Sequence, residues 1–182
     1  MTAPPEPSDD LTPSLVDRIR RGDGEAALHL ERLYRKPLVR FATGYVGVDE
    51  AADVVQEVFV KVLEVDEPPD AFRPWVYRVT RNHCLNRLRG RGRRPDGTPL
   101  PSRGDWTAAV TGPLSALFRR EREAQLAREI ETLTAEQREV LTLRSAEGLS
   151  RREVADVLEL SESVVKSRLY EALKRLRQRL ED

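Results

Sequence analysis

The chain has 182 residues, of which 34% are charged and 39% hydrophobic; this suits one or two small soluble domains and excludes a wholly disordered chain. The single cysteine, Cys84, excludes a disulfide framework and a cysteine-based zinc site, and no apolar run reaches the about 18 residues of a transmembrane helix. The acidic, proline-rich start MTAPPEPSDD lacks the apolar core of a secretion signal, so we expect a cytoplasmic protein without membrane insertion.

Charge is distributed unevenly although the net charge is zero. Residues 1–72 carry a net charge of −7, and residues 73–94 contain eight arginines and no acid. Residues 95–150 and 151–182 carry −2 and +1. An acidic segment followed by an arginine block indicates two different partners, one of them a polyanion.

Helix signals begin after residues 1–10, which we expect to form a disordered tail. Thr12 with a following proline predicts a first helix that Gly22 ends. Asp23 can cap the next helix, and Pro37 inside it should kink or split it.

Two further helices complete the predicted N-terminal domain, residues 11–90. Asp49 can cap the third helix, where a valine stripe recurs every three or four residues. Pro68 and Pro69 break the chain, and Pro74 opens a fourth helix that reaches about Arg89.

A Gly- and Pro-rich stretch, RGRGRRPDGTPLPSRG (89–104), predicts a flexible linker over residues 91–112 and a C-terminal domain over 113–182. In that domain we expect a helix over 114–133 and capping boxes at Thr134 and Ser150. Gly148 ends the helix between the boxes, and residues 159–161 make a short break. The predicted fold is all-α: two small helical domains, the second a helix-turn-helix of the winged-helix-like DNA-binding type.

The last helix, 161–180, has two faces at about 100° per residue. One face is predicted to be buried: Val165, Leu169, Ala172, Leu173 and Leu176. The opposite face would meet DNA bases: Ser163, Lys166, Ser167, Tyr170 and Lys174. Arg168 on the flank, with Arg151 and Arg152 at the preceding helix start, suits phosphates. An ordinary amphipathic helix with a solvated face is the alternative.

The arginine-rich segment 72–94 carries a second candidate face. Arg78, Asn82, Asn86 and Arg89 lie at helical spacing, and Trp75 lies at one end. Arginines for phosphates, amides for base edges and an aromatic ring for stacking suit unpaired nucleic acid. Further positive potential would come from Arg87, Arg91, Arg93 and Arg94. A basic helix end without a DNA role is the alternative, and Trp75 can equally be a core residue.

Segment 49–64 presents Asp53, Gln56 and Glu57 away from its valine stripe. This face could dock a basic protein surface or simply be solvated. The only histidines are His29 and His83, and adjacent His83 and Cys84 diverge by about 100° on a helix. No catalytic motif occurs, so we expect a protein that is not an enzyme and has no cofactor or metal.

Three segments occur in a fixed order: DEAADVVQEVFVKV, FRPWVYRVTRNHCLNRLRGRGRR and LTAEQREVLTLRSAEGLSRREVADVLELSESVVKSRLYEALKRLRQRL. Together they resemble the extracytoplasmic-function (ECF) group of sigma-70 family factors. The resemblance implies region two and region four domains joined by a linker that threads toward the polymerase active cleft. It also implies that Asp53, Gln56 and Glu57 bind the clamp helices of the largest subunit of core RNA polymerase, and that an anti-sigma factor is a further partner.

Promoter contacts are implied in the same way. The −10 element would be recognised and opened by the loop 65–73 and the helix after it, with Phe72, Trp75, Arg78, Asn82, Asn86 and Arg89 as contacts. The −35 element would be read by the face around Lys166, Ser167 and Tyr170. A helix-turn-helix regulator that acts without polymerase is the alternative function.

Overall fold

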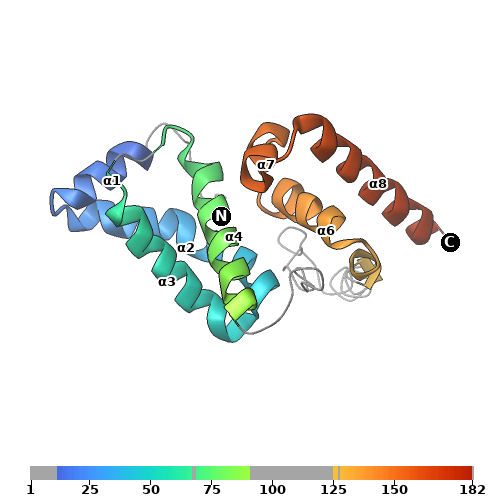
Figure 1. The fold of residues 1–182 in the computed structure, drawn as a ribbon, viewed down its shortest axis with the longest axis horizontal. Helices are drawn as coiled ribbons and strands as arrows, with labels where there is room; N and C mark the ends of the chain where they lie inside the picture. Colours follow the sequence, from blue (N-terminus) through green and yellow to red (C-terminus); the bar gives the residue numbers. More distant parts are fainter. Residues whose placement is uncertain (1–11, 67–68, 91–124, 127, 182) are drawn as a thin grey trace, which may run out of the picture.

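The computed structural model describes residues 12–66, 69–90, 125–126 and 128–181, and every regular element in these ranges is helical (Figure 1). The N-terminal unit contains α1 (Thr12–Arg20), α2 (Gly24–Val46), α3 (Val48–Glu64) and α4 (Phe72–Gly90). The C-terminal unit contains α6 (Ala135–Leu141), the π-helical turn η3 (Thr142–Ala146), α7 (Arg151–Leu158) and α8 (Glu162–Glu181). The all-α prediction is confirmed. The predicted tail, the linker and the first part of the helix expected over 114–133 lie outside the described residues.

Capping explains where the first long helices begin. The Asp23 side chain accepts the N–H of Ala26 at 3.1 Å, which confirms the predicted cap of α2. The predicted cap at Asp49 is wrong. Gly47, with φ 87°, ends α2 and directly precedes α3, so Asp49 falls inside the first turn of α3. A positive φ favours glycine, which is why the boundary lies at Gly47.

Of the kink or split predicted at Pro37, the split does not occur. α2 runs from Gly24 to Val46 as one helix with Pro37 inside it. Proline removes one backbone hydrogen bond at a cost of about 3 kcal/mol. Buried side chains on both sides of it, Leu30 and Tyr34 before and Leu38 and Phe41 after, hold the two halves on the same core.

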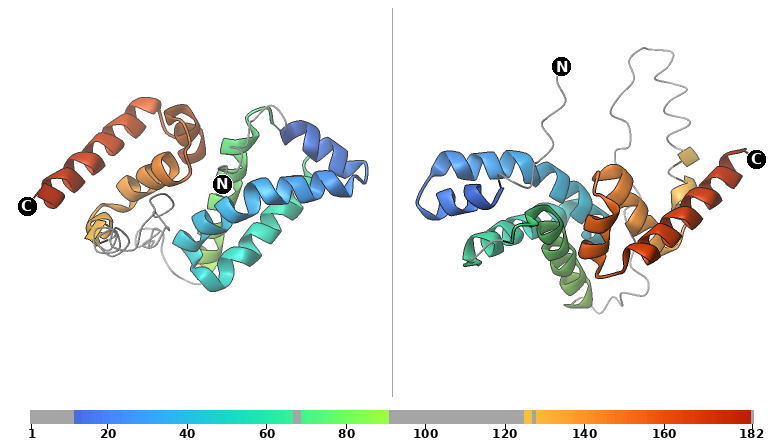
Figure 2. Two further views of the ribbon diagram at one scale, coloured as in Figure 1. Left: turned by 180° about the vertical axis from the view of Figure 1, so that it is seen from behind. Right: turned by 90° about the horizontal axis from the view of Figure 1, so that it is seen from above.

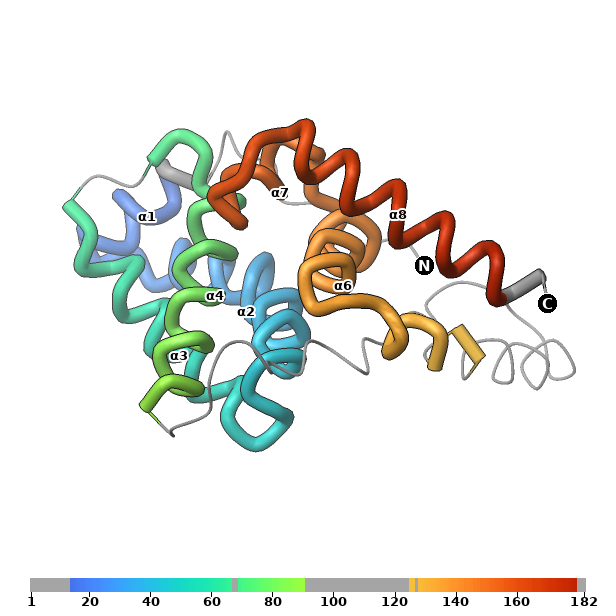
Figure 3. Tube along the Cα trace, turned by 45° about the vertical axis from the view of Figure 1, so that its right-hand side comes forward, coloured from blue at the N-terminus to red at the C-terminus, as the bar shows by residue number. Residues whose placement is uncertain are grey.

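α4 is the central element of the molecule. It packs on α2 and α3 through one side and on α7 through another (Figures 1 and 3). One hydrophobic cluster therefore runs through both units, from the valine stripe of α3 and Phe41 of α2 to Leu143, Leu149 and Val154. A second, smaller cluster joins α8 to Ile130, Leu133 and Leu141. Figure 2 shows α8 extending away from the N-terminal unit toward the C-terminus.

The helices of the C-terminal unit begin at the predicted caps, and one element was not predicted. The capping boxes at Thr134 and Ser150 are both present. The addition is η3, where the N–H of Glu147 bonds the carbonyl of Thr142, five residues back, at 3.1 Å. Such π-turns insert an extra residue into a helix, and the hydrophobic pattern carries no signal for them.

The turn between α7 and α8 contains a left-handed residue that is not glycine. Glu159 has φ 56° and ψ 44°, and the N–H of Leu160 bonds the carbonyl of Ala155 at 3.0 Å. A side chain in this conformation costs about 1–2 kcal/mol. The predicted break at 159–161 is confirmed, and the helix pair is closed by a strained residue.

Glu159→Gly should raise the free energy of unfolding by roughly 0.5–1 kcal/mol, because glycine relieves the strain while adding entropy to the unfolded chain. Urea titration followed by circular dichroism measures this. Exposed Glu171→Gly, inside α8, is the control and should destabilise by roughly 0.5 kcal/mol. A loss of stability in both variants would contradict strain at Glu159.

Cys84 should react slowly with thiol reagents in the folded protein. Its side chain is buried, and burial raises the pKa of the thiol to about 12 against an opposing effect of Arg87. The thiolate population is then about a thousandfold smaller than for a thiol with the ordinary pKa of 9.0. Reaction with a chromogenic disulfide at pH 8 should be slow in buffer and fast in urea; an immediate reaction in buffer would contradict this burial.

Candidate nucleic-acid interface

The outer face of α8 is exposed as the two-face pattern predicts. Ser163, Lys166, Ser167, Tyr170 and Lys174 are all exposed. Tyr170 is 63% exposed, so its ring is open to contact at this surface. Arg168 is half-buried on the flank, and Arg151 and Arg152 are exposed at the start of α7. Donors and one aromatic ring thus line a single surface of the helix-turn-helix.

The prediction that Leu173 belongs to the buried face of α8 is wrong. Leu173 is 47% exposed. The line that packs inward runs through Val165, Leu169, Ala172 and Leu176 at steps of four, three and four. Leu173 lies at the edge of this sector, about 70° from its centre, and adds an apolar group beside Tyr170.

The start of α8 is capped by a serine pair. The Ser161 hydroxyl accepts the N–H of Val164 at 3.4 Å and lies 2.9 Å from the Ser163 hydroxyl. Ser161 therefore satisfies one of the free backbone donors of the first turn. Ser163 shares its hydroxyl with this cap while it stays exposed at the candidate face.

The outer face of α4 also exists as predicted. Asn82, Asn86 and Arg89 are exposed and Arg78 is half-buried. The Arg89 guanidinium donates to the Asn86 side-chain oxygen at 2.8 Å. This bond leaves the Asn86 amide donors directed elsewhere, so the pair presents donors to an incoming acceptor.

Phe72 cannot contact a base in this structure, contrary to the prediction. It is 1% exposed, and its ring packs edge-on against Tyr34 with 5.4 Å between centroids. The reason is that Phe72 begins α4 instead of ending the preceding loop, so its side chain falls on the core side. Trp75 is half-buried and lies 5.4 Å from Phe72, which leaves part of its ring accessible.

Arg87 does not extend the positive potential as expected. It forms ion pairs with Glu50, at 3.6 Å, and with Glu57. The hydrogen bond to Glu57 is the main cause that raises the pKa of Arg87. Glu57 also lies 3.6 Å from His83 Nδ1. Predicted as a docking residue, Glu57 thus turns toward α4, and the remaining predicted contributors, Arg91, Arg93 and Arg94, lie outside the described residues.

The outer face of α3 is more apolar than the sequence indicated. Asp53 and Gln56 are exposed as expected. Val60 and Leu63 are exposed by 53% and 43% on the same side, because steps of three and four from Gln56 reach both. The sequence analysis did not single out Val60 and Leu63. Their exposure could have been predicted, because neither residue belongs to the valine stripe that faces the core. A groove of about 330 Å³ between α1, α2 and α3 adjoins Gln56 and Leu63.

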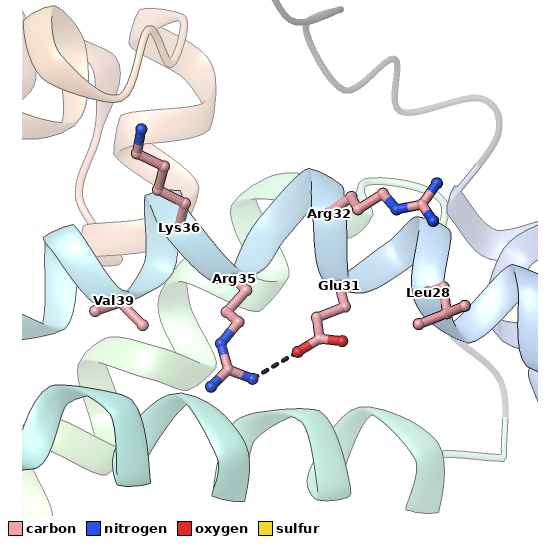
Figure 4. A pocket seen from close by; sticks show the side chains of 6 residues that line it. All are labelled: Leu28, Glu31, Arg32, Arg35, Lys36 and Val39. Atoms are coloured by element: carbon pink, nitrogen blue, oxygen red, sulfur yellow. Dashed lines mark hydrogen bonds and ion pairs between the residues drawn. The ribbon is translucent and has the colours of Figure 1, made fainter.

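A second depression follows the surface of α2 and is lined by one helix only (Figure 4). Arg35 pairs with Glu31 at 2.5 Å, whereas Arg32 and Lys36 point away on the other side. These groups do not converge on a common point, so the depression lacks the arrangement of a small-molecule site. Within the described ranges, no three potential metal ligands gather.

The two histidines and the cysteine lie on two helices. His29 is exposed on α2, whereas His83 and Cys84 lie on α4 with Cys84 buried.

In the part of the chain that the structure describes, no helix combines the length and the apolar character needed to cross a membrane.

Comparison with known proteins agrees with this arrangement. The family model of Sigma-70 region 2 matches residues 30–94, and that of Sigma-70 region 4 matches residues 123–176. The chain is 32% identical over 169 residues to an RNA polymerase sigma-H factor of Pseudomonas aeruginosa, covering 87% of this chain and 88% of that protein. It is 29% identical over 176 residues to an ECF RNA polymerase sigma-E factor of Escherichia coli K12, covering 91% and 92%.

Solved structures give the same result at the level of the fold. CnrH in complex with the cytosolic domain of CnrY has a TM-score of 0.63 at 24% identity, covering 96% of this chain and 98% of that one. The sigma factor RpoE in complex with the anti-sigma factor NepR, from Bartonella quintana, has a TM-score of 0.57 at 25% identity, covering 85% and 97%. With two sigma-70 regions in order and relatives aligned over most of their length, the chain belongs to the ECF group of the sigma-70 family and is an RNA polymerase sigma factor, which directs core polymerase to promoters.

Proposed function

We propose a division of labour within this sigma factor. Residues 11–90 bind core polymerase and open the −10 element, residues 91–112 link the domains, and residues 113–182 read the −35 element as duplex DNA. The observation that carries the proposal is the presence of two exposed polar faces, one on α4 and one on α8, on different units of the chain. The protein acts by binding, without covalent chemistry, cofactor or metal.

The α8 face reads duplex DNA in this proposal. Lys166, Ser167 and Tyr170 contact base edges in the major groove, with Ser163 and Lys174 on either side. Arg168, Arg151 and Arg152 contact phosphates and fix the position of the helix. Exposed Leu173 adds an apolar surface next to Tyr170 that suits a thymine methyl group.

The α4 face holds the opened strand. Arg78 and Arg89 contact phosphates, and Asn82 and Asn86 contact bases. Opening costs a few kcal/mol for each unstacked step, which these contacts and the accessible part of Trp75 offset. Phe72 acts in this account from within the core, because its ring supports Trp75.

The α3 face binds the clamp helices of the largest polymerase subunit. Asp53 and Gln56 supply polar contacts, and exposed Val60 and Leu63 supply the apolar centre that protein interfaces need. Glu57 contributes through its exposed part while it stays paired with Arg87.

We further propose an anti-sigma factor as a partner and the cytoplasm as the location. The support is the similar fold of the Bartonella quintana sigma factor, whose structure holds an anti-sigma factor. The exposed apolar groups of α3, next to a groove, provide a surface for such a partner.

Lys166→Ala with Tyr170→Ala should lower run-off transcription from a −35-dependent promoter by tenfold or more, since each base contact contributes about 1–3 kcal/mol. Co-elution with core polymerase should persist. Gln178→Ala, exposed farther along α8, is the matched control and should leave transcription unchanged. Full transcription by the double variant would refute the assignment of the −35 face.

Asp53→Arg with Gln56→Arg should weaken binding to core polymerase by at least tenfold, because like charges would meet a basic surface. Titration of labelled protein with core polymerase at low salt measures this. Glu25→Arg with His29→Arg, two exposed changes on α2, is the control. Unchanged affinity in the α3 variant would move the docking site elsewhere, and wild-type protein that never co-elutes with core would overturn the proposed function itself.

A further inference from the structure

The face of α8 that reads DNA in the proposed function carries one acidic side chain, Glu171. Around the helix axis it lies about 40° from Ser167 and about 60° from Lys174, so it belongs to the same surface. The other two acids of α8, Glu162 and Glu181, stand at the two ends of the helix. A single carboxylate therefore lies on a surface whose other charged groups are cations.

Glu171 and Lys174 are both exposed, and the structure shows no hydrogen bond or ion pair between either side chain and another of the described residues. They are three residues apart, which separates their Cα atoms by about 4.5 Å along the helix axis. An ion pair between exposed side chains at this spacing contributes little to stability. Both groups can therefore turn toward a ligand at small cost.

Two arginines of the described part of α8 flank Glu171, and neither forms an ion pair with it. Arg175, four residues later, is exposed, and Arg168, three residues earlier, is half-buried. A backbone hydrogen bond and the Thr134 side chain are the main causes that lower the pKa of Glu136 in α6, and the charge of Arg168 adds to them. Arg168 thus has an acidic neighbour of its own, and the carboxylate of Glu171 stays available.

A carboxylate on a DNA-reading face restricts which group can lie opposite it. Phosphates repel it, and so do the acceptors of guanine and thymine. In the major groove only the exocyclic amines of cytosine and adenine donate hydrogen bonds. Adenine places its N7 acceptor next to its amine, whereas cytosine presents the amine without an acceptor, so a carboxylate favours cytosine.

Lys174 is suited to the other half of the same base pair. In a C·G pair the cytosine N4 amine donates to guanine O6, so this donor and this acceptor lie about 3 Å apart at the floor of the major groove. A carboxylate for the amine and a neighbouring ammonium for O6 and N7 form the complementary pattern. The opposite charge beside each group also offsets part of the cost of removing it from water.

We propose that Glu171 and Lys174 together read one C·G base pair of the −35 element. The Glu171 carboxylate accepts from cytosine N4, and the Lys174 ammonium donates to guanine O6 or N7. The inference rests on the proposed function of α8 and adds the identity of one base pair to it. Glu171 is thus a specificity-determining residue, although its charge lowers the attraction of α8 to DNA in general.

The test is transcription by the full chain with core polymerase from promoters whose −35 element is randomised. A barcode in each transcript identifies its promoter, so sequencing gives the base preference at every position. A good base contact discriminates by about 5- to 150-fold. The wild type should therefore prefer C·G at one position at least fivefold over the other pairs.

Glu171→Gln should change the preference at that position from C·G to A·T. The glutamine amide offers the acceptor and the donor that adenine N6 and N7 require, and Lys174 still meets an acceptor, thymine O4. Glu171→Ala and Lys174→Ala should each weaken the preference for C·G at the same position. Their effects should not add in the double variant, because both side chains contact one base pair.

Glu131→Gln, an exposed change of the same charge outside α8, is the control and should leave every position unchanged. An unaltered base preference in Glu171→Gln would overturn the proposal. An equal change at all positions would also overturn it, since a lost charge without a base contact acts on every sequence alike. A wild type that shows no base preference anywhere in the −35 element would instead refute the proposed function of α8 itself.

Discussion

The packing of two buried glutamates against arginines and tyrosines of the other unit is the interaction on which the observed arrangement depends. Glu139 and Glu147 lose nearly all contact with water. The penalty is several kcal/mol for each ion, and it is offset only where the geometry is good and the remaining oxygens are bonded. Here each carboxylate meets one arginine and one tyrosine hydroxyl. The apolar cluster that runs through both units excludes water around these pairs.

α4 has three sides with different surroundings, and this explains why its arginines are not equivalent. One side, with Val76 and Cys84, belongs to the core of its own unit. A second side, with Arg73, Tyr77 and Arg81, faces α6 and α7. Only the third, with Asn82, Asn86 and Arg89, is open to solvent. A positive block in a sequence therefore overstates the charge that a folded protein offers to DNA, since part of the block is neutralised internally.

Local signals predicted most of the fold, and non-local contacts explain most of the errors. Capping boxes at Thr134 and Ser150 and the cap at Asp23 need only a few neighbouring residues, so the sequence contains them in full. Continuity through Pro37, the burial of Phe72 and the pairing of Arg87 depend on elements distant in the chain. The burial of Glu139 and Glu147 could not be predicted, because a glutamate in a helical segment is expected to be exposed to water unless the arginine that faces it is known. The predicted cap at Asp49 is wrong for a different reason. The boundary between the two helices lies at Gly47, a glycine with positive φ, and not at a polar capping residue.

The π-turn η3 has a consequence for how the C-terminal unit tolerates changes in length. The extra residue in Thr142–Ala146 sets the rotation of everything that follows, up to the capping box at Ser150. Deleting one residue there would restore a regular α-helix and turn Glu147 by about 100° about the helix axis. The carboxylate would then point away from Arg40, while the helix-turn-helix itself could still form.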